Sequence, residues 1–74
     1  MVTKRGLIVD INGNRMIVDD VKTIDGVDYV VLFSATDKIF RIAKEIVVDG
    51  KAKFDFLSID ESIKVANAID KLGK

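Results

Sequence analysis

The sequence of 74 residues contains no cysteine and no histidine. The absence of cysteine excludes disulfide bonds and thiolate nucleophiles, and without either residue an ordinary zinc, haem or iron–sulfur site cannot be built. Histidine is also the side chain that most often acts as a general base near neutral pH. We therefore predict no catalytic, metal-binding or cofactor-binding residues, and a protein that is not an enzyme.

Long apolar runs and an excess of one charge are missing as well. The first apolar run ends at Asp10, too early for a secretion signal, and no stretch approaches the roughly 18 apolar residues of a membrane span. Twelve basic residues balance twelve acidic ones, so strong global attraction to nucleic acid or to an anionic membrane is not expected. These features predict one small domain over residues 1–74, cytoplasmic, without membrane association and of bacterial or phage type.

The residues that are abundant favour β-structure. Valine and isoleucine each occur ten times, and β-branched side chains pack well on a pleated surface. Turn signals at Asn12-Gly13, Asp25-Gly26, Thr36-Asp37 and Asp49-Gly50 separate the apolar segments. The predicted strands are 5–11, 14–24, 27–34, 38–48 and 51–57. Residues 27–34 are apolar on both faces and are placed centrally, whereas the register of 15–24 is left open because alternation breaks at Asp19-Asp20.

A C-terminal helix is predicted over residues 59–72. Ser58 and Glu61 have the spacing of a capping box, in which the serine hydroxyl accepts from the Glu61 amide and the carboxylate reaches back. An apolar stripe follows at helical spacing and is expected to pack on the sheet: Ile59, Ile63, Ala66, Ile69 and Leu72. Gly73 is the predicted C-terminal cap, with Lys71 and Lys74 near the negative end of the helix dipole.

Together these elements predict an α+β fold, an antiparallel β-meander of four to five strands with one C-terminal helix packed on one face. One helix covers one face of such a sheet, yet the middle strands carry apolar residues on both. Either the sheet curls and shields its second side, or another protein covers it, and a homodimer would use the same patch twice. We expect a partner surface on this second face, formed by Ile8, Ile17, Val30 and Leu32, or on an edge strand beside it.

Charge is distributed unevenly along the chain. Residues 10–37 hold six acids and two bases, whereas residues 38–53 hold five bases and two acids. The five bases form a predicted basic patch that could bind phosphates, with Phe40 as a stacking ring: Lys38, Arg41, Lys44, Lys51 and Lys53. The favoured alternative is that they are solvated charges that keep strand edges of neighbouring molecules apart.

Three segments carry a family resemblance: GVDYVVL at 26–32, IFRI at 39–42 and FDFLSIDE at 54–61. With them the chain resembles the small YrzB-like bacterial domains of unknown function over about residues 7–72. The resemblance implies a β-meander leading into a capped C-terminal helix and a bacterial setting. The chain departs from those domains in net charge, because they are typically very acidic. The resemblance implies no activity and no site residues.

The predicted function is that of a small non-catalytic binding module acting through a protein–protein surface. Its expected partner is another protein or a second copy of the chain in a homodimer, and no cofactor is expected. Two alternatives stay open from the sequence: a phage-encoded inhibitor of a host enzyme or defence system, and a weak nucleic-acid-binding domain that uses the basic strand face. Nucleic acid is the less favoured partner.

Overall fold

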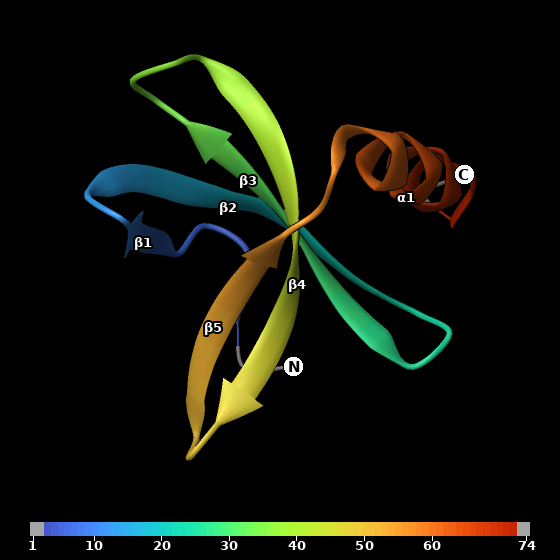
Figure 1. Cartoon of the computed structure of the whole chain (residues 1–74), viewed down its shortest axis with the longest axis horizontal. Helices are drawn as coiled ribbons and strands as arrows, with labels where there is room; N and C mark the ends of the chain where they lie inside the picture. Colours follow the sequence, from blue (N-terminus) through green and yellow to red (C-terminus); the bar gives the residue numbers. More distant parts are fainter. Residues whose placement is uncertain (1–2, 73–74) are drawn as a thin grey trace.

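The fold is an antiparallel five-stranded meander followed by one helix, as predicted (Figure 1). It is seen in a computed structural model that describes residues 3–72, so the predicted cap Gly73 and Lys74 lie outside the described residues. Sheet order follows chain order, which places the apolar β3 in the centre as expected. The elements are β1 (Ile8–Ile11), β2 (Asn14–Ile24), β3 (Val27–Ser34), β4 (Ile39–Val48), β5 (Lys51–Phe56) and α1 (Ile59–Leu72).

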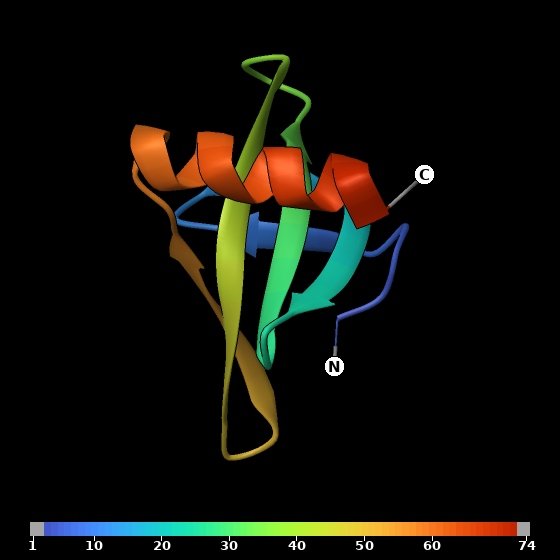
Figure 2. The ribbon, with the colours of Figure 1, turned by 90° about the vertical axis from the view of Figure 1, so that its right-hand side faces the viewer.

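The sheet curls into a nearly closed, barrel-like shape. Figure 2 shows β1 running crosswise behind β3 and β4, while α1 lies in front of them, across the opposite side of the sheet. We call the concave side the inner face and the side that carries α1 the outer face. Curling lets the meander shield its own inner face, which is the first of the two solutions that the sequence left open.

Tight turns fix the meander. Asn12 and Gly13 have φ values of 51° and 82°, so both central residues of the β1–β2 turn are left-handed, as a type I′ turn requires. Asparagine and glycine tolerate this region best, which explains why this dipeptide predicts the turn correctly. Both central residues also have positive φ in the Asp25-Gly26 and Asp49-Gly50 turns. The chain therefore reverses where the sequence indicated.

A bulge in β2 explains the broken alternation. Val18 pairs with Leu32, but the next paired residue, Asp20, lies opposite Val31, so Asp19 is an extra residue on the β2 side. The bulge is held by Arg5, whose Nε donates to the Asp19 carbonyl at 3.3 Å and lies 3.9 Å from Asp20 Oδ1. Beyond it, Val21 returns to the inner face opposite Val30.

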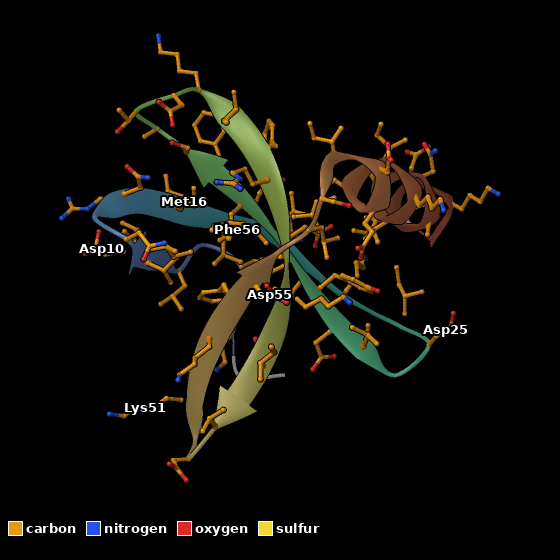
Figure 3. The ribbon with its side chains drawn as sticks, viewed as in Figure 1. Asp10, Met16, Asp25, Lys51, Asp55 and Phe56 are labelled. Carbon is orange, nitrogen blue, oxygen red and sulfur yellow. The ribbon has the colours of Figure 1, made fainter. Side chains whose placement is uncertain are left out.

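The buried core lies on the inner face and is made by strands. Its members are Met16, Val18, Val30, Leu32 and Ala43, with Val9, Ile11, Val21, Phe54 and Phe56 packed around them. Figure 3 shows Met16 and Phe56 within the curl of the sheet. In β5, Ala52, Phe54 and Phe56 form the less exposed side and the charged residues form the exposed side.

The placement of Val30 and Leu32 corrects one prediction. Both were expected at an exposed partner surface with Ile8 and Ile17, but both are 0% exposed. The strand register is the reason, because Val18 lies opposite Leu32 while Ile17 lies opposite Phe33. Val30 and Leu32 therefore share the inner face with Met16 and Val18, and Ile17 belongs to the outer face.

The helix begins at its predicted cap. Glu61 N donates to Ser58 Oγ at 3.2 Å, and Ser62 N donates to the Ser58 carbonyl at 2.8 Å. The Glu61 carboxylate was expected to reach back to the cap. It lies instead 4.0 Å from Lys44 Nζ, which joins the first turn of the helix to β4.

The helix face that meets the sheet differs from the predicted stripe. The less exposed side chains are Ser62, Val65, Ala68 and Ile69, whereas Ile59 is 81% and Ile63 is 57% exposed. The less exposed face is thus displaced by about one residue around the helix. Among the stripe residues whose side chains the structure describes, Ile69 alone lies on this face, and Ile59 and Ile63 are exposed.

Thr3, the first described residue, is buried beside β4. Thr3 N donates to the buried Glu45 side chain at 3.0 Å, but the buried Thr3 hydroxyl has no hydrogen-bond partner among the described residues. An unsatisfied buried polar group destabilises the folded state. We expect Thr3→Val to raise the free energy of unfolding by about 1 kcal/mol, measured by urea denaturation.

Thr23→Val is the matched control for this substitution. Thr23 Oγ1 donates to Asp28 Oδ1, so the same isosteric change there removes a hydrogen bond and is expected to destabilise by about 0.5–1 kcal/mol. If both variants changed the free energy of unfolding in the same direction, the assignment of the Thr3 hydroxyl as an unsatisfied group would be contradicted.

Across residues 3–72, no helix is both long enough and apolar enough to cross a membrane.

Candidate binding groove

An open groove of about 670 Å³ separates α1 from the outer face of the sheet. Its sheet wall includes Val31 from β3 and Ile39, Phe40 and Ile42 from β4. Its helix wall includes four residues of the predicted apolar stripe, Ile59, Ile63, Ala66 and Ile69. The stripe therefore lines a groove rather than closing onto the sheet.

Cross-strand pairing extends the apolar sheet wall into a row. Ile8 lies opposite Ile17, Ile17 opposite Phe33, and Phe33 opposite Phe40, so one residue from each of β1 to β4 stands on the outer face. We call these four residues the apolar row. The rings of Phe33 and Phe40 lie 5.0 Å apart between centroids. Ile8 is 59% and Phe40 is 61% exposed, so the row ends in exposed side chains on both sides.

The polar residues of the groove are mostly acidic. Asp19 and Asp20 enter from the β2 bulge and Asp70 from the last turns of α1. Arg41 is the one base among the groove-lining residues, and its guanidinium carbon stacks 3.9 Å from the centre of the Phe56 ring. The groove thus joins apolar walls to a rim with more negative than positive charge.

Two of the four predicted partner-surface residues lie on this side of the sheet. Ile8 and Ile17 belong to the apolar row, whereas Val30 and Leu32 are in the core. Sequence reasoning missed Ile59 and Ile63 as exposed residues. The sequence did contain a second helical face that could have been expected to meet the sheet, because Ser62, Val65 and Ile69 also fall on one side of the helix.

The structure does not bring the five predicted basic residues onto one surface. Lys38 lies in the β3–β4 turn, whereas Lys51 lies opposite Val48 at the other end of β4, a strand of ten residues that spans roughly 30 Å. Arg41 stacks on Phe56, and Lys44 lies beside Glu61. Lys51 and Lys53 share the exposed side of β5.

The acidic residues near the β2–β3 turn serve as turn residues or lie at strand ends. Asp25 adopts a positive φ of 51° in the turn, and Asp28 accepts a hydrogen bond from Thr23. Within residues 3–72, no three Asp or Glu side chains are gathered as a metal site would require. The groove is therefore the candidate site.

No family model, curated protein or solved structure matches the chain. The resemblance to YrzB-like domains accordingly stays a prediction.

Proposed function

We propose that the chain is a non-catalytic binding module that holds a short amphipathic segment of another protein in the groove between α1 and the sheet. The observation that carries this proposal is the exposure of large apolar side chains on both walls. Phe40 stands on the sheet wall, and Ile59 and Ile63 stand on the helix wall. Contiguous apolar surface of this kind is costly to leave in water and marks interaction sites.

The rim indicates the chemistry of the segment. Asp19, Asp20 and Asp70 line the groove together with its apolar walls, so a segment with apolar anchors and flanking lysine or arginine is complementary. An amphipathic helix with anchors three or four residues apart is one standard way to fill such a groove. The same rim disfavours a nucleic acid at this site, because phosphates would face carboxylates.

The two alternative functions predicted from the sequence would use either the groove or a different surface. An inhibitor of a host enzyme would be a special case of a protein-binding module, and the chemistry of the groove does not distinguish it. Nucleic-acid binding would rely on Lys51 and Lys53 of β5, away from the groove. Neither alternative is supported by an observation as specific as the exposed walls.

Selection from a peptide library displayed on phage tests the proposal. The immobilised chain is expected to enrich peptides with apolar residues at helical spacing and added Lys or Arg. Phe40→Glu places a charge on the sheet wall and is expected to weaken the binding of these peptides at least tenfold, measured by fluorescence anisotropy.

Ile46→Glu is the matched control. Ile46 is a similarly exposed apolar residue on β4, but it lies opposite Lys53 in the far hairpin and does not line the groove. Peptide affinity should therefore stay unchanged in this variant. The proposal fails if no peptide is enriched, or if both variants bind the selected peptides as well as the original chain does.

A further inference from the structure

Within residues 3–72, the outer edge of β5 has no strand partner. β5 is the last strand of the sheet, and among the described strands it pairs with β4 alone. Leu57 N donates to the Ile42 carbonyl, and because antiparallel pairs alternate, Lys51, Lys53 and Asp55 direct their backbone groups toward β4. The N–H and C=O groups of the alternate residues therefore point outward from the edge: Ala52, Phe54 and Phe56.

The hairpin that carries this edge extends away from the body of the molecule. Figure 2 shows the β4–β5 hairpin projecting beyond the other strands on the side away from the β3–β4 turn. Its three apolar residues Ile46, Val47 and Val48 are exposed, and because successive residues alternate, they lie on both faces of the hairpin. An opening of about 480 Å³ lies beside β5, lined by residues 9–12 and 52–54.

The charges of β5 are complementary to those of the same strand in reverse. Residues whose backbone groups point outward can form hydrogen bonds only with residues of the second copy whose backbone groups also point outward. The two-fold axis of an antiparallel pair of β5 strands must therefore pass at a single residue rather than between two residues. Centred on Phe54, it sets Lys53 opposite Asp55 of the second copy and Asp55 opposite Lys53 of the second copy. It also sets Ala52 opposite Phe56 of the second copy.

The neighbouring registers lack this complementarity. Centring the pair on Lys53 sets that lysine opposite itself, and centring it on Asp55 sets that aspartate opposite itself. Centring it on Ala52 sets Lys51 opposite Lys53. Like charges directly opposite each other destabilise a sheet, so only the Phe54-centred register joins opposite charges without opposing like ones.

We propose that β5 is a dimerisation strand, through which a second copy of this chain adds its own β5 about a two-fold axis at Phe54. The two five-stranded sheets then become one continuous sheet. The outward backbone groups of Ala52, Phe54 and Phe56 gain partners, and the two Phe54 side chains lie next to each other. This interface is separate from the groove and does not rest on the proposed function.

Charge reversal at β5 tests the dimer by sedimentation equilibrium over a concentration series. The original chain is expected to approach twice the mass of 8.2 kDa at high concentration. Lys53→Asp makes both paired positions acidic, and Asp55→Lys makes both basic. Each variant alone is expected to dimerise at least tenfold more weakly, because two attractive pairs become repulsive.

Mixing the two variants is the decisive measurement. An acidic β5 opposite a basic β5 restores both pairs, so the mixture should form a heterodimer with an affinity near that of the original dimer. A variant that had merely lost its fold would not be rescued by mixing. Lys51→Asp is the control, because Lys51 lies opposite Leu57 of the second copy in this register and its reversal should change the dimer little.

Three results would overturn the proposal. The original chain could stay monomeric at every concentration, which would mean that the lysines of β5 keep strand edges apart. The Lys53→Asp variant could dimerise as tightly as the original chain, or the mixture could fail to recover. Phe40→Glu should leave the dimer intact, so loss of peptide binding and loss of dimerisation can be told apart.

Discussion

Leu32→Ala is expected to lower the free energy of unfolding by about 3–5 kcal/mol. Leu32 is 0% exposed, lies on the central strand β3 and belongs to the core cluster with Met16, Val18 and Val30. The change removes buried apolar surface and leaves a cavity that the surrounding strands fill only in part. A chain of this length has roughly 4–11 kcal/mol of total stability, so the variant should be close to unfolding in urea titrations.

Ile63→Ala is the matched surface substitution. Ile63 is 57% exposed on the helix wall of the groove, and its truncation is expected to cost less than about 1 kcal/mol. Leu32→Met, which keeps the volume nearly constant, should cost less than about 1.5 kcal/mol and should stay folded if Leu32→Ala does not. Equal losses for Leu32→Ala and Ile63→Ala would contradict the assignment of the core to the inner face.

Ala66→Pro is expected to abolish most of the helical signal while the sheet stays folded. Proline inside a helix removes one backbone hydrogen bond and its ring clashes with the carbonyl four residues earlier, here that of Ser62, at a cost of about 3 kcal/mol or more. The buried core cluster contains strand residues only, so we expect it to persist without α1. The circular dichroism signal at the helical minimum should weaken, and the amides of Val30 and Leu32 should stay protected from hydrogen exchange.

Ile59→Pro provides the control for the proline itself. Ile59 is the first residue of α1, where the missing N–H is unpaired in any case and the fixed φ suits the helix. This variant should keep its helical signal. Loss of protection at Val30 and Leu32 in the Ala66→Pro variant would instead mean that the sheet cannot persist without the docked helix.

The local elements could be predicted because each carries its own chemistry. Asn12-Gly13 supplies two left-handed residues for a type I′ turn, and Ser58 supplies an acceptor for the Glu61 amide. The bounds differ mainly at β1, which was predicted from residue 5 and begins at Ile8. Gly6 has a positive φ of 84° and Leu7 N donates to the Lys4 carbonyl, so a turn occupies the segment before the strand.

The candidate site could be predicted only in part, because it depends on how the elements meet. The bulge at Asp19 decides which residues of β2 lie opposite which residues of β3, and this register moved Leu32 into the core and Ile17 to the outer face. The less exposed side of the helix is the one that carries Ser62 and Val65, which leaves Ile59 and Ile63 exposed beside the groove. Neither the rotation of the helix nor the bulge register follows from periodicity alone.

The sequence by itself determined the α+β meander, its turns, its central strand and its capped helix, because these depend on interactions between residues near one another in the chain. The tertiary structure decided which apolar face would be sealed. Curling of the strands buried one side of the sheet within the chain. A helix that meets the other side along a narrow face left the groove and the apolar row exposed, since burial is set by the packing of distant segments.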